Sequence, residues 1–394
     1  MKIVALHTDF RIYWPMRLEH LAKQLLKRGD NITVIEIAGK GSPYSFAAHE
    51  INDTLNWICL FPEAKIEDIN PAFAKKEVLS KLDELNPDVV MSGSIAFTSG
   101  AAAVDWAKRN NRGVVIFDDS KKEDVQRNFL VNTVKKILYA NVDAIFCPAP
   151  DWIETFKYWG FKEKAIFFGV DVVDNSFWSK TASQKFDISA PYFLTVGRHI
   201  KRKNFHLLID AFVLFKRESG NNARLVLVGD GVETDHLKKR VPEDLQDDIL
   251  FLPLQDQNTL VSLYHNAYFF ILPSISEQWG LVVNEAMACG LPVIVSENAG
   301  CVQSLVEENK NGYWFNPCDL HSLASTLEKA SALSESEIKE MKNNSLEIIS
   351  HWDLDRFTTG AIGAVDYAVK NKRRPFYFIG KWILEKWSGR YNPG

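Results

Sequence analysis

Residues 267–296 read AYFFILPSISEQWGLVVNEAMACGLPVIVS, and this stretch decides the fold. The runs 267–272 and 293–295 are short, apolar and rich in β-branched or aromatic residues, so they are predicted to be buried strands. A helix is predicted to begin at Gly280 and to fill the segment between them. A strand, a helix and a second strand in this order predict one repeat of a parallel, doubly wound sheet.

The same alternation of short apolar runs and helical patterns continues along the rest of the chain, interrupted by a polar, aperiodic segment at 172–191. We therefore predict an α/β fold with two doubly wound, Rossmann-like domains, 1–180 and 190–350, followed by C-terminal helices in 351–394. Because ligands of such sheets bind beyond the carboxyl ends of the strands, two facing sheets predict one interdomain cleft. Further strands are expected at 3–6, 32–37, 58–61, 88–91, 113–117, 144–147, 165–168, 192–196, 225–228, 249–252 and 313–315.

The composition is that of a globular protein of 394 residues, with 46% hydrophobic and 24% charged residues. The net charge of −4 gives no reason to expect nucleic acid as a partner. The five cysteines are scattered and form no C-x-x-C pair, which argues against a structural zinc site or a disulfide framework. No apolar window approaches the roughly 18 residues of a spanning helix. We expect a cytoplasmic protein, or one attached peripherally at the inner face of a membrane.

Two carboxylates flank the predicted helix start: Glu277 precedes it and Glu285 follows eight residues later. Gly280 permits close approach of a ligand to the backbone, and the N–H groups after it suit phosphate or sugar hydroxyls. Eight helical residues rise about 12 Å, an upper figure for this partly looped stretch, which approximates the span from sugar to ribose in a nucleotide-sugar. The alternative for two arbitrary glutamates is a dipole-stabilising acid and a solvated side chain.

The whole string from Glu277 to Val293 resembles the E-x₇-E element of family 4 GT-B glycosyltransferases, also known as glycosyl transferases group 1. The similarity continues through AGCVQSLVEENKNGYWFNPCDLHSLA, residues 299–324, and is densest between about residues 190 and 330. It implies that Glu277 holds sugar hydroxyls and that Glu285 holds the ribose of a nucleotide-diphosphate sugar. It also implies backbone contacts near Gly280.

A second element, Gly197-Arg198-His199-Ile200-Lys201-Arg202-Lys203-Asn204, is similar to the G-R-x-x-x-x-K-G loop of that family. The resemblance assigns Arg198 and Lys203 to the diphosphate, and fixed cations suit the negative charge that builds on a departing diphosphate. Asn204 stands where the family has glycine, a change that asparagine's tolerance of the left-handed conformation accommodates. The alternative for the turn is a solvated basic loop. Two weaker matches to the family lie at residues 225–233 and 251–254. Together with the two elements above, they imply these donor contacts: Gly197, Gly229, Leu254, Trp279, Gly280, Leu281, Val282 and Glu285.

The acceptor side is expected in the N-terminal half, where the motifs are thinner. Candidates are His7, in the loop that includes Arg11, and Arg17, with Asp118 and Asp119 after another strand. For the paired acids, helix capping is the favoured alternative. Residues 169–171, Gly-Val-Asp, are similar to the N-G-V-D hinge of the family.

The resemblance implies a retaining transfer of a sugar to a glycan or lipid-linked acceptor in polysaccharide or glycoconjugate synthesis. No cofactor and no metal are expected, because Asp353-Leu354-Asp355 has the spelling of a metal motif but lies between helical patterns. A nucleotide-sugar epimerase and a non-catalytic nucleotide-sugar-binding protein are the rival interpretations. The last helix of that family crosses back onto the N-terminal domain, and the resemblance implies the same for residues 351–394. The alternative for the aromatic and basic tail 373–394 is a membrane-surface anchor that inserts Trp382, Ile383, Leu384 and Trp387.

Overall fold

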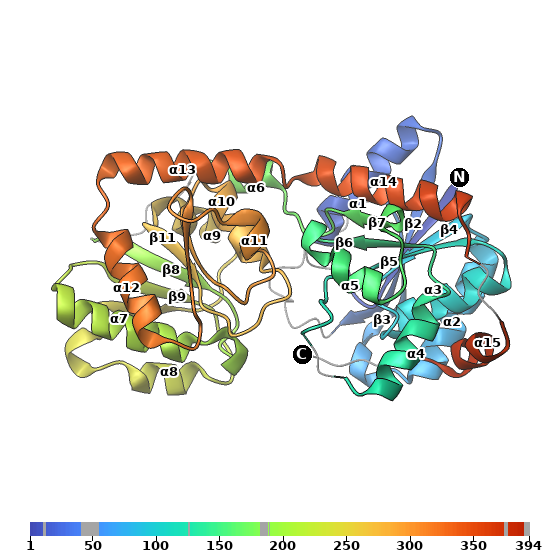
Figure 1. The fold of residues 1–394 in the computed structure, drawn as a ribbon, viewed down its shortest axis with the longest axis horizontal. Coiled ribbons are helices and arrows are strands. Elements are labelled where there is room, and N and C mark those ends of the chain that lie inside the picture. The colour runs from blue at the N-terminus through green and yellow to red at the C-terminus, as the bar shows by residue number, and fades with distance from the viewer. Residues whose placement is uncertain are drawn as a thin grey trace. The chain divides into compact units, whose positions relative to one another are not determined.

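The computed structural model describes residues 1–10, 13–40, 55–124, 127–181, 188, 190–373 and 377–389. The chain forms two compact units: unit 1 consists of Met1–Val172 with Leu354–Gly394, and unit 2 is Val173–Asp353. Each unit contains one parallel sheet on which helices pack (Figure 1). The predicted α/β class with two Rossmann-like domains is confirmed. The first unit boundary lies eight residues before residue 180, where we expected the first domain to end.

The sheet of unit 1 has seven strands in the order β3-β2-β1-β4-β5-β6-β7. Each neighbouring pair is parallel; for example, Ile3 lies opposite Ile32 on one side and Val89 on the other. The predicted apolar runs coincide with these strands, although β2 and β3 are longer than expected. The strands are β1 (Lys2–His7), β2 (Asn31–Lys40), β3 (Asn56–Lys65), β4 (Val89–Ser92), β5 (Gly113–Phe117), β6 (Ala144–Cys147) and β7 (Ile166–Phe168).

The sheet of unit 2 repeats this winding with six parallel strands in the order β10-β9-β8-β11-β12-β13. In both sheets the chain moves outward from the first strand, returns, and continues on its other side, as in dinucleotide-binding folds. Every strand predicted for this half is present. The strands are β8 (Tyr192–Val196), β9 (Arg224–Val228), β10 (Ile249–Leu252), β11 (Phe269–Leu272), β12 (Val293–Ser296) and β13 (Gly312–Phe315).

Helices cover the two sheets. Those of unit 1 are α1 (Trp14–Lys27), α2 (Pro71–Leu85), α3 (Thr98–Arg109), α4 (Phe129–Tyr139), α5 (Ile153–Tyr158), α14 (Leu354–Lys370) and α15 (Tyr377–Lys386). Those of unit 2 are α6 (Asn175–Trp178), α7 (Phe205–Ser219), α8 (Thr234–Arg240), α9 (Gln257–Asn266), α10 (Leu281–Ala288), α11 (Val302–Leu305), α12 (Leu320–Ser331) and α13 (Glu335–Ser350). Within the described part of the chain, no helix combines the length and the apolar character needed to cross a bilayer.

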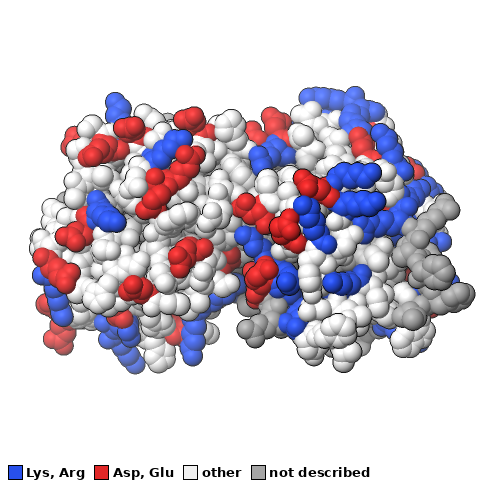
Figure 2. Space-filling model, in the orientation of Figure 1, with Lys and Arg blue, Asp and Glu red and all other residues white. Residues whose placement is uncertain are grey.

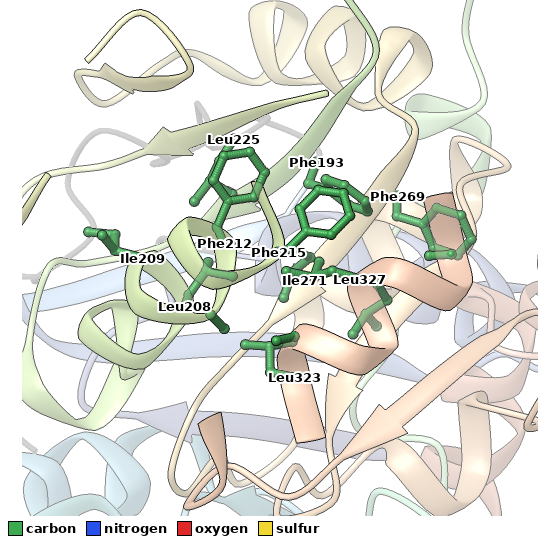
Figure 3. Packing of buried hydrophobic residues seen from close by; sticks show 14 of the residues in the cluster. Phe193, Leu208, Ile209, Phe212, Phe215, Leu225, Phe269, Ile271, Leu323 and Leu327 are labelled. Atoms are coloured by element: carbon green, nitrogen blue, oxygen red, sulfur yellow. The ribbon is translucent and has the colours of Figure 1, made fainter. Parts of the chain in front are cut away.

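The core of unit 2 lies between its sheet and the helices α7 and α12. Figure 3 shows phenylalanines from β8, α7 and β11 close to leucines of α12, and all of these side chains are buried. Phe193 of β8 packs edge to face against Phe212 and Phe215, with ring centroids 6.4 and 6.1 Å apart. This rigid core fixes the positions at which β8 and β11 end.

The interrupting segment 172–191 contains a short helix that the sequence pattern does not predict. Asp174 caps α6 by accepting hydrogen bonds from the backbone N–H groups of Ser176 and Phe177, and Trp178 is buried in unit 2. The expectation of a plain linker was therefore wrong for its first part. Four residues are too few to show a helical period, so the sequence pattern does not predict this helix. Residues 182–187 and 189 lie outside the described part.

The two C-terminal helices belong to unit 1. Helix α14 packs against α1 and against β5, β6 and β7, and its buried face includes Phe357, Ala361 and Val365. In α15 the side chain of Leu384 is buried, and the indole of Trp387 donates a hydrogen bond to the Ile95 carbonyl at 2.9 Å. The buried Leu384 therefore contradicts the membrane-anchor alternative in the form in which all four residues insert. Residues 374–376 and 390–394 of the tail lie outside the described part.

Candidate functional site

The predicted donor-side residues gather at the carboxyl ends of β8 and β11 in unit 2. These strands are neighbours in the sheet, and the chain leaves them toward opposite edges. Such a reversal opens a crevice at the strand ends, which is where ligands bind in this class of sheet. The turn 197–203 follows β8, and the loop 273–280 follows β11. Both predicted motifs therefore lie at the same point of the sheet.

The basic turn after β8 ends in one turn of 3₁₀ helix, Lys201–Lys203. Lys203 is buried, whereas Lys201 is exposed. Asn204 then adopts the left-handed conformation with φ of 58°, and its side-chain amide donates to the Pro317 carbonyl at 2.9 Å. The backbone carbonyl of Arg202 accepts from the Ile275 N–H at 2.9 Å, which joins the turn to the loop after β11.

Lys203 and Glu277 form an ion pair, with 2.5 Å between Nζ and Oε2. Their side chains are only 10% and 14% exposed, so the pair is largely shielded from water. Ser274 Oγ donates a second hydrogen bond to the same carboxylate oxygen at 3.1 Å. Burial alone would raise the pKa of Glu277, but the charge and hydrogen bond of Lys203 outweigh it and hold the pKa below its usual value. Glu277 is therefore a carboxylate at neutral pH.

Gly280 is the N-cap residue of α10 and has a φ of 106°, a conformation that residues other than glycine rarely adopt. A Cβ atom there would lie 2.8 Å from Cδ2 of Leu272, at the end of β11. The loop before it is fixed by neighbouring backbone, since the N–H groups of Gly300 and Cys301 donate to the carbonyls of Glu277 and Trp279. The first N–H groups of α10 are thus held at the strand ends, where they can bind an anion or a hydroxyl.

Glu285 lies more than one turn inside α10 and is 3% exposed. The hydroxyl of Tyr264 in α9 donates a hydrogen bond to its Oε2 at 2.9 Å. A carboxylate accepts up to about four hydrogen bonds, so this bond occupies part of its capacity. Trp279 is 2% exposed; its indole donates to Asn284 at 2.9 Å and its ring lies 5.1 Å from that of Trp352. Trp279 therefore supports the loop from inside unit 2.

The turn after β9 approaches the turn after β8 closely. A Cβ atom on Gly229 would lie 1.9 Å from the carbonyl oxygen of Gly197, so both motif glycines are where backbone meets backbone. Between the two turns lies His199, which is fully buried and forms a 2.9 Å hydrogen bond with Thr234. Burial lowers the pKa of His199, so the ring is neutral. Of the remaining predicted contacts, Leu254 is 38% exposed after β10 and shares no described contact with the ion pair.

His7, at the carboxyl end of β1 in unit 1, lies among aromatic rings. It stacks on Phe117 with ring centroids 5.4 Å apart, and the rings of Phe10 and Trp14 lie 5.3 and 6.1 Å away. Burial lowers the pKa of His7 to about 4, against a smaller opposite effect of Asp9. The imidazole is therefore neutral and able to hydrogen-bond without carrying charge. Arg11, in the same loop, lies outside the described residues.

Arg17 was proposed for the acceptor side, but its side chain is 2% exposed. Its guanidinium donates two hydrogen bonds to the Val172 carbonyl, at 2.9 and 2.6 Å, and lies 3.9 Å from Asp171. Its Cζ atom is also 5.3 Å from the ring centroid of Trp14. These contacts hold Arg17 against the backbone at Val172, where the first segment of unit 1 ends, and keep its side chain out of solvent.

Asp118 and Asp119 differ from each other. Asp118 accepts hydrogen bonds from Ser94, Ser120 and the Tyr139 hydroxyl, a saturated arrangement. The next described helix is α4, which Asn128 caps, so neither acid caps a helix and the helix-capping alternative was wrong. Burial, followed by repulsion from Asp171 and Asp118, raises the pKa of Asp119 well above its usual value.

The structure also identifies supporting residues that the motif matches do not include. Tyr264, Ser274 and Thr234 hydrogen-bond to Glu285, Glu277 and His199, respectively. Only Ser274 lies close to its partner in sequence, so no spacing rule predicts the other two. Across the described residues there is no group of three or more histidine, cysteine, aspartate or glutamate side chains placed to hold a metal ion.

Comparison with known proteins supports the same interpretation for this half of the chain. Residues 176–347 match the family model of glycosyl transferases group 1. An uncharacterized glycosyltransferase of Methanocaldococcus jannaschii is 30% identical over 202 residues, covering 49% of this chain and 48% of that protein. Mannosylfructose-phosphate synthase of Agrobacterium fabrum is 28% identical over 211 residues, 49% and 46% of the two chains. The matches thus span about half the length of these relatives.

Solved structures resemble the chain over nearly its whole length. A glycosyltransferase from Rickettsia africae superposes with a TM-score of 0.72 at 14% identity, covering 94% of this chain and 98% of that one. Anabaena HepE in complex with UDP gives 0.72 at 17% identity, with 93% and 100% covered. At these identities the likeness establishes the fold. Residues 176–347 thus match the group 1 glycosyltransferases, and the chain has the two-domain GT-B fold of the solved glycosyltransferases that it resembles.

Proposed function

We propose that the protein is a retaining, metal-independent glycosyltransferase that moves a sugar from a nucleotide-diphosphate sugar to a hydroxyl of a glycan or lipid-linked acceptor. The observation that carries the proposal is the shielded Lys203–Glu277 pair at the ends of β8 and β11. It places a cation suited to a diphosphate and a carboxylate suited to sugar hydroxyls side by side. Hydrogen bonding to vicinal hydroxyls is the chemistry that an ionised carboxylate offers.

In the proposed complex, Arg198 and Lys203 bind the diphosphate and Glu277 binds hydroxyls of the sugar. The N–H groups at the start of α10 assist, and Glu285 binds the ribose. Retention follows from a front-face reaction: the acceptor oxygen bonds to the anomeric carbon on the side from which the diphosphate leaves, and a departing phosphate oxygen takes the acceptor proton. The cations stabilise the negative charge that develops on the leaving group, so no enzymic nucleophile is needed.

The names of the relatives indicate a class of acceptor but do not identify the acceptor itself. Names among them include an alpha-monoglucosyldiacylglycerol synthase, 33% identical over 124 residues, and the O-antigen chain mannosyltransferase RfbU, 33% identical over 149 residues. Both describe transfer to lipids or polysaccharides, and we propose that this protein acts in such a pathway. The cytoplasm is the proposed compartment, in keeping with five scattered cysteines, none of which forms a disulfide.

A donor screen tests the proposal. UDP- and GDP-sugars are compared for their effect on the melting temperature, and the stabilising donor is then supplied in labelled form with and without candidate acceptors. Label transferred to an acceptor with retained anomeric configuration supports the proposal. An epimerised donor would instead indicate a nucleotide-sugar epimerase. Tight binding of the donor without turnover would indicate a non-catalytic nucleotide-sugar-binding protein. Activity that EDTA abolishes and Mg²⁺ restores would contradict metal independence.

A further inference from the structure

Helix α4 of unit 1 begins with apolar side chains in solvent. Phe129 is 81% exposed, Leu130 72% and Val131 49%, and Val134 one turn later is 37% exposed. The opposite face of the helix supplies the packing, since Leu138 and Tyr139 are buried. Helix α4 lies at the lower edge of unit 1 in Figure 1, where Figure 2 shows uncharged surface bordered by Lys and Arg. An exposed cluster of this kind marks an interaction surface.

Cations surround the apolar residues, and aromatic rings hold several of them in place. Lys135 of α4 lies over the ring of Trp159, with 4.6 Å between Nζ and the centroid. Lys136 and Lys122 both lie over the ring of Tyr158, at 4.1 and 4.2 Å. Lys136 is exposed, so its ammonium group remains available to anions, whereas burial lowers the pKa of Lys135.

A hollow of 820 Å³ adjoins α4 and is lined by eleven residues, five of them cationic and none acidic. Lys136 belongs both to α4 and to this lining, and it follows Phe129 by two helical turns, about 10 Å. The apolar cluster and the cationic hollow are therefore parts of one surface. The cationic lining residues are Lys136, Lys162, Lys164, Lys372 and Arg373. Such a concentration is unexpected in a chain of net charge −4.

We propose that α4 and the cationic hollow form a docking surface for a bilayer that contains anionic lipids. Phe129, Leu130, Val131 and Val134 enter the boundary between head groups and acyl chains, and the five cations bind lipid phosphates. Lysine is depleted in protein–protein interfaces, whereas lysine beside exposed apolar side chains is typical of helices that lie on membranes. This composition favours a lipid surface over a protein partner. The binding is independent of whether the protein transfers sugar.

Flotation with lipid vesicles tests the docking surface. The full-length protein is mixed with vesicles of phosphatidylcholine alone or with about 30% phosphatidylglycerol. We expect it to float with the anionic vesicles only. Replacing Phe129 and Leu130 together by serine should lower the bound fraction at least about tenfold. The matched control is Leu26→Ser on α1, which removes another exposed leucine of unit 1 (73% exposed) and should leave binding unchanged.

The charge component is tested separately. Lys162→Gln with Lys164→Gln should lower binding to anionic vesicles about tenfold or more, whereas Lys23→Gln with Lys27→Gln on α1 should not. Unchanged melting temperatures would show that the variants are folded. The proposal is overturned if the wild type fails to float, if it floats equally with neutral vesicles, or if the Phe129 and Leu130 variant binds as well as the control. It is also overturned if that variant changes only the oligomeric state of the lipid-free protein, which would indicate a protein interface.

Discussion

At the scale of single residues, the strongest assignment is the ion pair between Lys203 and Glu277. The two side chains are only 10% and 14% exposed, so an unpaired charge at either position would be costly. The pair costs desolvation, and such pairs contribute little to stability. Its position at the ends of β8 and β11 therefore points to ligand binding as the reason for its presence.

The corresponding prediction concerns Lys203→Ala. If the cation stabilises the leaving diphosphate, kcat/KM should fall at least ~10²-fold, because the interaction is strongest when the charge develops. The measurement is initial-rate kinetics with the donor that the screen identifies. Lys201→Ala, an exposed lysine of the same turn, is the control and should retain near-wild-type rates. Near-wild-type kinetics for Lys203→Ala would refute its role.

His7 makes a prediction about pH. Its pKa is about 4 in the folded chain and about 6.5 when unfolded, so the unfolded chain binds the extra proton between these values. Stability from this residue is complete above about pH 6.5 and is lost as the pH falls toward 4. Between pH 7 and 5 the loss should be about 2 kcal/mol. Urea unfolding of wild type and His7→Phe at both pH values measures it, and equal losses in the two proteins would contradict the effect.

At the scale of elements, the strand ends position the site, and the beginning of α10 is its most constrained part. Gly280→Ala should destabilise the protein by about 1–3 kcal/mol and weaken donor binding, because the new methyl group meets Leu272 in a left-handed conformation. Thermal melting and donor titration measure the two effects. Gly220→Ala is the control: it has φ of 61°, but a Cβ atom there would meet no heavy atom within 4 Å, so it should cost about 1 kcal/mol and leave donor affinity unchanged. Equal donor affinity for Gly280→Ala and wild type would show that α10 does not hold the ligand.

Elements with a strong sequence pattern were predictable, and those defined by tertiary contacts were not. Strand β5 is a continuous apolar run and β8 is interrupted only by Thr195, so their bounds followed from composition alone. Helix α6 has four residues and no period. Likewise, the motifs identified Glu285, but its partner Tyr264 comes from another helix with no local signal. The saturation of Asp118 by Ser94, Ser120 and Tyr139 also depends on contacts between separate segments.

At the scale of the whole molecule, unit 1 is discontinuous in sequence, and α14 completes its core. Phe357 of α14 is 1% exposed, and its ring lies 5.2 Å from that of Phe146 and 5.9 Å from that of Trp14. Helix α14 packs along β5, β6 and β7 as well. Residues near the C-terminus thus stabilise the unit to which the N-terminus belongs.

This arrangement predicts two unfolding transitions, one for each unit, and a core substitution in one unit should lower only the transition of that unit. Phe357→Ala should destabilise unit 1 by about 3–5 kcal/mol and leave the donor-stabilised transition of unit 2 in place. Phe212→Ala, in the core of unit 2, should do the reverse. Calorimetry with and without donor distinguishes the transitions. A single transition that both variants lower equally would contradict the division into two units.

The return of the chain to unit 1 at Leu354 also has a consequence for synthesis on the ribosome. Domains generally fold as they emerge, the N-terminal one first. Here the strands of unit 1 emerge first, but their covering helix α14 follows only after all of Val173–Asp353. Unit 2 is therefore complete while the nascent unit 1 still exposes the surface that Phe357, Ala361 and Val365 later cover. The domain that is translated first is therefore the last to finish folding.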